Sequence, residues 1–249
     1  MQDSRAEDQK ITVDVVIPVC NEENLLEQSV NKLIQILSGE KELDWRILIA
    51  SNGSTDMTKK IGEGLAKTCP RVSFFHISKR GRGRALRKAF GESKASVCFY
   101  TDVDLAVDIN TLPTLTKEAF RRQGVAMPNR LGAGTKNKRP YHRILFSRLY
   151  NVFIRILFPK TVIRDAQVGM KAVYRGIIEE FLKKTENNGF FFDTELLLMA
   201  EKAGRPIVQI PADCYDMRRG NARIVPYVLE ASFGLMKMRI NLFRCLSKK

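Results

Sequence analysis

Two aspartates one residue apart follow an apolar, β-prone run near the middle of the chain. Val97–Tyr100 is rich in β-forming residues, and Asp102 and Asp104 come shortly after it. A carboxylate at the end of a buried strand is costly unless something pairs with it. Mg²⁺ and Mn²⁺ prefer carboxylate oxygens and often share them with phosphates. The pair is therefore a candidate metal site, while a solvated surface turn is the alternative interpretation.

The elements before this pair predict an α/β protein. Apolar β-prone runs alternate with segments whose apolar residues recur at helical spacing, which is typical of a mostly parallel sheet. The expected strands are 11–20, 45–50, 72–77 and 97–101, and the expected helices are 22–37, 55–66 and 85–90.

Polar residues follow the first, second and fourth of these strands. Cys20-Asn21-Glu22, Ser51-Asn52-Gly53 and Asp102-Val103-Asp104 stand at their carboxyl ends. Ligands of such sheets bind beyond the carboxyl ends of the strands. We therefore expect the three clusters to meet at one edge of the sheet, which favours a site over a chance turn.

The charge of the chain predicts an anionic partner. Its 249 residues include 42 Lys and Arg against 27 Asp and Glu, for a formal net charge of +15. Such an excess suits nucleic acid, a phosphorylated substrate or an anionic membrane surface. The length suits one large domain.

The basic loop around Gly81-Arg82-Gly83 fits none of the common phosphate-binding motifs. Leu86 stands where a dinucleotide fingerprint needs its third glycine, and no Gly-Lys-Ser/Thr of a P-loop follows. The basic residues between Lys79 and Lys88 are compatible with nucleic acid, but no aromatic residues for base stacking lie among them. Nucleic-acid binding is thus an alternative, and we expect no nucleic-acid partner.

Two later segments are basic and amphipathic. In 141–158 the polar residues Arg143, Ser147, Asn151 and Arg155 share one stripe, opposite many apolar ones; 228–249 is similar. Such helices suit a membrane interface, and a core-packing helix with a solvated basic face is the alternative. The longest uncharged run has 9 residues (Ile47–Thr55), too short to span a bilayer. With no signal peptide at the polar start, we expect a cytoplasmic protein, peripheral on the inner membrane face.

Eight motifs occur in the order found in a known family. They are Val16-Ile17-Pro18-Val19-Cys20-Asn21-Glu22-Glu23, Asn52-Gly53-Ser54-Thr55-Asp56, Gly81-Arg82-Gly83, Tyr100-Thr101-Asp102-Val103-Asp104-Leu105, Asn129-Arg130-Leu131, Ser147-Arg148-Leu149-Tyr150-Asn151, Asp165-Ala166-Gln167-Val168-Gly169-Met170-Lys171 and Phe191-Phe192-Asp193-Thr194-Glu195-Leu196-Leu197. Over residues 11–225 the chain resembles the family-2 glycosyltransferases, specifically the polyprenyl-phosphate sugar synthases typified by dolichyl-phosphate mannose and glucose synthases.

The resemblance implies a GT-A fold and an inverting hexose transfer with Mg²⁺ or Mn²⁺. The donor would be UDP-glucose or GDP-mannose and the acceptor a polyprenyl (dolichyl-type) phosphate. Asp104 and Asp102 would hold the metal and act in catalysis with the acceptor-phosphate ligands Arg130, Arg143 and Ser147. The donor nucleotide would contact Pro18, Cys20, Glu22, Ile49, Ser51, Asn52, Asp102, Val103, Asp104, Arg218 and Arg223. Asp165, Gln167 and Asp193 would contact the sugar, although Asp193 could instead cap a helix over 194–202.

The chain departs from the family pattern at the base-binding positions. Ser51 and Asn52 replace an acidic pair, and Cys20 replaces a customary Tyr. Asn both donates and accepts hydrogen bonds, unlike a carboxylate, so the base is left open. A soluble hydroxyl acceptor is the alternative substrate, and it would need a carboxylate base. The expected organisation is a flexible start (1–10), a catalytic domain (11–226) and a basic amphipathic helix (227–249).

Overall fold

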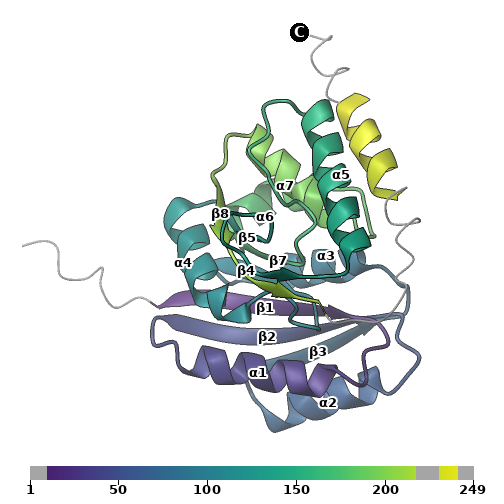
Figure 1. Ribbon diagram of the computed structural model, residues 1–249. Helices are drawn as coiled ribbons and strands as arrows, with labels where there is room; N and C mark the ends of the chain where they lie inside the picture. The colour runs from purple at the N-terminus through teal and green to yellow at the C-terminus, as the bar shows by residue number, and fades with distance from the viewer. Residues whose placement is uncertain (1–9, 217–229, 241–249) are drawn as a thin grey trace, which may run out of the picture.

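A seven-stranded sheet runs through the molecule, as the computed structural model shows for the residues it describes, 10–216 and 230–240 (Figure 1). The strands lie in the order β3-β2-β1-β4-β7-β5-β8. Of these, β7 is antiparallel to both neighbours and the other pairs are parallel. The sheet strands are β1 (Ile11–Val19), β2 (Leu43–Asn52), β3 (Val72–Ile77), β4 (Val97–Thr101), β5 (Val125–Asn129), β7 (Met170–Tyr174) and β8 (Ile207–Pro211).

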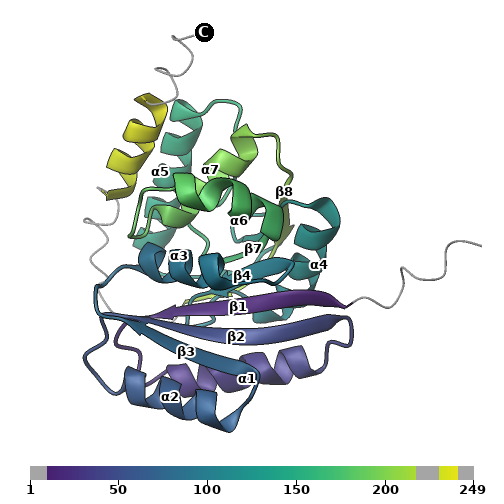
Figure 2. The same ribbon diagram turned by 180° about the vertical axis from the view of Figure 1, so that it is seen from behind.

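Helices cover the sheet, and a two-stranded parallel ribbon lies beside it. In both views α1 and α2 lie on one side of β1–β3 and α3 on the other (Figures 1 and 2). The helices are α1 (Leu26–Ser38), α2 (Thr58–Thr68), α3 (Arg82–Glu92), η1 (Ile109–Thr111), α4 (Leu112–Arg122), α5 (Tyr141–Leu157), α6 (Arg175–Phe181), η2 (Leu182–Lys184) and α7 (Phe192–Lys202), and the ribbon pairs β6 (Asn137–Lys138) with β9 (Cys214–Tyr215).

The apolar patterns explain the core. Val15, Ile17 and Ile49 are wholly buried in the central strands, which have helices on both faces. In α1 the buried residues Leu26, Val30, Leu33 and Leu37 share one face of the helix. The four predicted strands and three predicted helices of the first half are confirmed, within a few residues at their ends.

The helix α3 begins earlier than predicted because the glycine loop forms its first turn. It starts at Arg82 rather than Ala85, after Gly81 with φ 152°. A Cβ on Gly81 would lie 2.6 Å from the Asn188 carbonyl oxygen, and one on Gly83 would lie 2.8 Å from the Gly189 oxygen. These glycines therefore let the 188–189 segment close over the start of α3.

The polar stripe predicted on α5 is partly buried, and several of the apolar residues of this helix are exposed. Ser147 and Asn151 of the predicted polar stripe are buried, whereas Leu149 and Ile156 are 56% and 67% exposed. Tyr150 and Ile154 of the predicted apolar face are buried as well, and Arg155 of the stripe is exposed. The helix α5 therefore buries residues of both predicted faces. A helix over 230–240 lies beside α5 in both views (Figures 1 and 2). Among the described residues, no helix combines the length and the apolarity needed to cross a bilayer.

Candidate active site

The two aspartates stand at the carboxyl end of β4, at the centre of the sheet. The Asp102 amide donates to the Gly169 carbonyl oxygen (3.0 Å). A Cβ on Gly169 would lie 1.9 Å from Asp102 Oδ2, so only glycine leaves this carboxylate its place. Asp104 accepts a hydrogen bond from the Ala106 amide (3.3 Å). Gly169 thus leaves room for the Asp102 carboxylate.

Arg82 joins Asp102 to a buried charge cluster. Its NH2 donates to Asp102 Oδ1 (3.0 Å), and its NH1 donates to Asp193 Oδ2 (3.2 Å). The guanidinium also lies over the Tyr100 ring, 4.9 Å from its centroid. Burial alone would lower the pKa of Arg82, but the charges of Asp102 and Asp193 outweigh it and raise this pKa above its usual value.

Asp193 is the centre of this cluster. Its Oδ2 also accepts from the Tyr100 hydroxyl (2.6 Å) and from Lys171 Nζ (3.1 Å). Burial would raise the pKa of Asp193, but Lys171 and Arg82 outweigh it and bring the pKa to about 2. Asp193 lies inside the first turn of α7, which begins at Phe192, and no side chain caps that helix. The prediction of Asp193 as an N-cap is therefore wrong.

Arg130 and Asp165 form a buried bidentate pair. Arg130 Nε and NH2 each donate to one oxygen of Asp165 at 2.8 Å, and the Arg130 amide also donates to it. Burial would raise the pKa of Asp165, but the Arg130 charge and hydrogen bonds lower it. Asp165 is wholly buried with both oxygens occupied. Its predicted sugar contact is thus replaced by the positioning of Arg130.

A second pair of arginines adjoins Arg130. Arg143 is paired with Asp216, and Arg139 NH2 donates to Ser147 Oγ at 2.8 Å. Burial, and then the Arg130 charge, lower the pKa of Arg139. Its NH1 is a buried nitrogen with no hydrogen-bond partner among the described atoms. Arg139 thus keeps a hydrogen-bond donor that the described protein atoms do not use.

Two neighbouring cavities bring these groups together. Arg130, Asp102 and Gly169 line both of them and so stand at their junction. The larger, about 250 Å³, is lined by Arg82, Asp102, Arg130, Arg139, Arg143, Phe146, Ser147, Tyr150, Gln167, Gly169, Phe190, Asp193, Thr194 and Ala231. The smaller, about 70 Å³, is lined by Thr101, Asp102, Asp104, Ala106, Val107, Arg130, Gly169, Met170, Cys214 and Asp216.

The residues expected to hold the nucleotide divide into partly exposed and buried ones. Partly exposed are Pro18, Cys20 and Glu22; buried are Ile49, Ser51, Asn52 and Val103. Ile49 and Ser51 have no exposed surface, so their side chains cannot contact a ligand here.

The amide of Asn52 has a structural task. Its Nδ2 donates to the Val19 carbonyl oxygen (2.9 Å), and its Oδ1 accepts from the Gly81 amide (3.0 Å). It therefore ties the end of β1 to the start of α3. Arg218 and Arg223, predicted to close over the diphosphate, lie outside the described residues.

The carboxylates suit a hard divalent cation shared with phosphates. Asp102 and Asp104 line the smaller cavity and could offer it carboxylate oxygens. Mg²⁺ is often held by one or two carboxylates plus substrate phosphates. Within residues 10–216 and 230–240, no group of three or more His, Cys, Asp or Glu side chains forms a metal cage. Two carboxylates without a complete ligand cage suit a metal ion that binds together with a diphosphate.

The basic segment 79–88 is largely committed to the fold. Arg82 points into the site, and Arg87 donates to the carbonyl oxygens of Leu182, Thr185 and Asn187. Lys88 pairs with Glu92. Arg82 and Arg87 are thus used within the fold, whereas Lys79, Arg80 and Lys88 are exposed.

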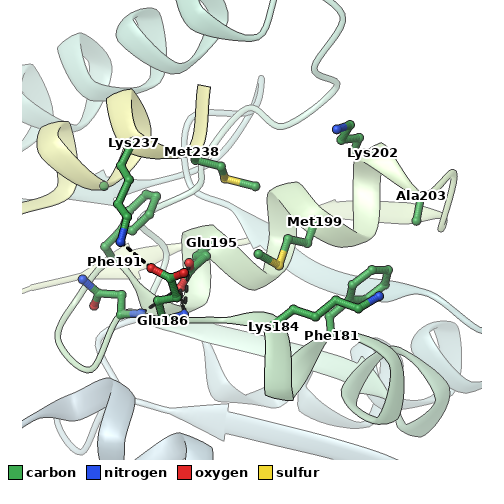
Figure 3. A pocket seen from close by; sticks show the side chains of 12 residues that line it. Phe181, Lys184, Glu186, Phe191, Glu195, Met199, Lys202, Ala203, Lys237 and Met238 are labelled. Atoms are coloured by element: carbon green, nitrogen blue, oxygen red, sulfur yellow. Dashed lines mark hydrogen bonds and ion pairs between the residues drawn. The ribbon is translucent and has the colours of Figure 1, made fainter. Parts of the chain in front are cut away.

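A larger cavity, about 660 Å³, shares no lining residue with these two cavities (Figure 3). It is bounded by η2, α7 and the 230–240 helix, with Met199 and Met238 on its walls. At one end Lys237 pairs with Glu186, and Glu195 accepts from the amides of Glu186 and Asn187. The carboxylates of Glu186 and Glu195 thus have partners within the protein.

Sequence reasoning assigned no role to Arg82, Lys171, Arg139 or Asp216. Lys171 gave a usable signal, because a lone cation inside the apolar strand β7 implies a buried partner. Arg82, between two glycines, gave a weaker one. Nothing local singles out Arg139 or Asp216, because their partners lie on other elements.

Several known proteins are similar to this chain in sequence. Glycosyltransferase AglD of Haloferax volcanii is 33% identical over 211 residues, which are 82% of this chain and 33% of that protein. Dolichyl-phosphate beta-glucosyltransferases of Saccharomyces cerevisiae and Homo sapiens are 24% and 23% identical, over 85% and 86% of this chain and 69% and 70% of theirs. The chain thus spans about a third of the length of AglD and about two thirds of the others.

Solved structures share the fold. Glucosyl-3-phosphoglycerate synthase from Mycobacterium tuberculosis, in complex with Mn²⁺, UDP-glucose and phosphoglyceric acid, superposes with a TM-score of 0.68 at 18% identity. The match covers 92% of this chain and 79% of that one. The architecture is therefore the GT-A fold, as predicted. The model of the family "Glycosyl transferase family 2" matches residues 14–182, more than half of the chain. The protein therefore belongs to that family.

Proposed function

We propose that the protein transfers a hexose, with glucose as the first candidate, from a nucleotide diphosphate sugar to a polyprenyl (dolichyl-type) phosphate. The observation that carries this proposal is the composition of the 250 Å³ cavity. Four guanidiniums line it, from Arg82, Arg130, Arg139 and Arg143, together with apolar walls from Phe146, Tyr150, Phe190 and Ala231. Arginines suit a phosphate and apolar walls suit a lipid chain.

On the donor side, Asp102 and Asp104 would hold Mg²⁺ or Mn²⁺. The cation, when bound, supplies charge stabilisation to the leaving diphosphate. Pro18, Cys20 and Glu22 flank the expected nucleotide position, and Arg218 and Arg223 remain predicted donor ligands. Gln167 and Asp193 line the 250 Å³ cavity, and we propose that they face the sugar.

On the acceptor side, Arg130, Arg139, Arg143 and Ser147 would orient the lipid phosphate. An oxygen of that phosphate forms the new bond to the anomeric carbon, while the bond from that carbon to the diphosphate breaks. In-line attack inverts the anomeric centre, and the nucleoside diphosphate leaves with the electron pair. Asp165 keeps Arg130 in place through two hydrogen bonds.

The state of Asp193 favours a phosphate acceptor over a hydroxyl. A hydroxyl nucleophile needs a general base, and such a base works best with a pKa near the working pH. Two cations and a tyrosine hold the pKa of Asp193 at about 2. A phosphate monoester, with a second pKa near 6, is already an oxyanion at neutral pH. It therefore needs no such base.

A soluble phosphorylated acceptor is the second candidate. The M. tuberculosis neighbour holds phosphoglyceric acid, and arginines would also bind the phosphate of such a molecule. The apolar walls of the cavity argue for the lipid. The donor preference for UDP-glucose over GDP-mannose rests on the names of the relatives and of this neighbour.

We further propose that the protein is a peripheral membrane protein that binds an anionic membrane surface on the cytoplasmic face. The exposed apolar stripe of α5 consists of Tyr141, Leu145, Leu149, Val152 and Ile156, with exposed fractions between 43% and 79%. The adjacent 230–240 helix exposes Phe233, Met236 and Ile240. Contiguous apolar surface of this kind marks interaction sites, and the membrane would supply the lipid acceptor.

The proposal is tested by combining each of two sugar donors with each of three acceptors. Radiolabelled UDP-glucose and GDP-mannose would be offered with Mn²⁺ to a polyprenyl phosphate, to phosphoglycerate and to a simple glycan. We expect product on the lipid phosphate, and product on phosphoglycerate or the glycan alone would overturn the assignment. Arg130→Lys should lower kcat/KM for the lipid phosphate about 100-fold through loss of bidentate geometry, with the donor KM unchanged.

A further inference from the structure

Arg82 is a second cation on a carboxylate that the proposed function assigns to a metal. Asp102 is 47% exposed at its side chain and faces both cavities, whereas the side chain of Arg82 is 11% exposed. The Arg82–Asp102 ion pair therefore stands at the water-accessible end of an otherwise buried cluster.

The other end of that cluster does not depend on Arg82 for its charge balance. Lys171, wholly buried, donates to Asp193 and also to Tyr100 and two backbone carbonyls. Asp193 therefore has Lys171 as its counter-ion, and Arg82 is the counter-ion of Asp102. The ring of Tyr100 and the contact with Asp193 keep the guanidinium in place.

A divalent cation and a guanidinium on one carboxylate repel each other strongly in a partly buried site. The balance changes when the metal brings a diphosphate, because that group offers Arg82 an anion in place of Asp102. Arg82 lines the same cavity as Asp102, and its guanidinium carries five N–H donors. It can thus exchange partners with a small change of side-chain conformation.

We infer that Arg82 neutralises Asp102 in the donor-free protein and transfers its positive charge to the donor diphosphate when metal and donor bind together. This inference rests on the proposed function only for the metal-bound diphosphate donor. It makes the site select the metal–nucleotide complex over the free metal ion. Arg82 is on this view both a positioning residue for Asp102 and a ligand of the donor.

The test compares metal alone with metal plus nucleotide. Mn²⁺ binding would be followed by electron paramagnetic resonance without any nucleotide, and UDP binding in saturating Mn²⁺ by calorimetry. For Arg82→Met we expect Mn²⁺ alone to bind about tenfold more tightly and UDP about tenfold more weakly. These opposite signs are the signature, because a structural defect would weaken both.

Two further variants keep the test decisive. Arg82→Lys retains the charge, so Mn²⁺ alone should bind about as weakly as to the wild type. Arg80→Met is the charge-matched control, because Arg80 is exposed next to the same loop; it should change metal affinity by less than threefold. If Mn²⁺ alone binds no more tightly to Arg82→Met than to the wild type, the inference is overturned.

Failure of the inference remains separate from failure of the proposed function. No acceptor is present in either measurement, so the identity of the acceptor does not enter. Wild-type protein that binds UDP with Mn²⁺ supports the donor assignment, whatever Arg82→Met does. Absence of that wild-type binding overturns the donor assignment and the inference together.

Discussion

The donor-side and acceptor-side clusters of this site are built from the same groups in opposite proportion. On the donor side, Asp102 and Asp193 pair with the cations Arg82 and Lys171, and Asp104 lines a cavity together with Asp102. On the acceptor side, three guanidiniums stand against the carboxylates Asp165 and Asp216. Among these described groups, carboxylates outnumber cations in the first cluster, and guanidiniums outnumber carboxylates in the second.

This difference indicates how one site can bring two anions together. An excess carboxylate attracts a cation, and the cation can carry a diphosphate. An excess guanidinium attracts a phosphate directly. The paired ions fix the geometry of each cluster, so that the excess charge is already oriented when a ligand arrives. Arg130 lines both cavities and so stands where the two anions would meet.

The largest expected effect comes from removing charge on the donor side. Asp104→Ala should lower hexose transfer about 1000-fold, because a metal contributes several kcal/mol of charge stabilisation. Transfer to a polyprenyl phosphate would be measured with radiolabelled donor. The matched control is Asp44→Ala, which removes an exposed carboxylate near the start of β2, at the opposite end of the parallel strands from Asp104. Full activity of Asp104→Ala would sink the donor-side assignment.

The acceptor side should depend on its ion pair for stability. Asp165→Asn leaves Arg130 buried without its counter-ion, which typically costs about 3–5 kcal/mol. The free energy of unfolding would be measured by urea titration. The double variant Asp165→Leu/Arg130→Met should recover most of that loss while remaining inactive. A loss below about 1 kcal/mol for Asp165→Asn would contradict a buried, uncompensated guanidinium.

Acid should affect the donor-side cluster in a defined pH range. The folded-state pKa of Asp193 is about 2, below its ordinary value of 3.8. A depressed pKa stabilises the fold above the unfolded pKa, and this contribution disappears as the pH falls from about 4 to about 2. It amounts to about 2 kcal/mol. Unfolding measured between pH 2 and pH 5 should therefore be less pH-dependent for Asp193→Asn, and an equal dependence would argue against the low pKa.

The smallest effect concerns the membrane surface rather than either cluster. Leu149→Glu on the exposed apolar stripe of α5 should weaken binding to anionic liposomes about tenfold, since it places a charge where apolar contact is proposed. Flotation would measure the binding, and a thermal midpoint near that of the wild type would confirm the fold. Lys202→Gln, on the different helix α7, lowers the net charge by the same one unit and controls for that change. Equal flotation of Leu149→Glu and wild type would remove α5 from the proposed membrane contact.

The sequence by itself determined the first half of the fold and the location of the site. Alternating apolar runs predict parallel strands and their helices, and a parallel sheet gathers its strand ends at one edge. Asp102 and Asp104 could therefore be placed before any coordinates were known. The family motifs likewise pointed to Arg130, Arg143 and Ser147, which line the 250 Å³ cavity.

Only the tertiary structure decided which charges neutralise one another and which face of α5 is buried. Asp165 pairs with Arg130, 35 positions away, and Asp193 with Arg82, 111 positions away. Helical periodicity shows that α5 has two faces, but burial of Ser147 and exposure of Leu149 depend on what packs against them. Ion pairs and burial are properties of groups brought together from distant segments, and local sequence patterns do not encode those distances.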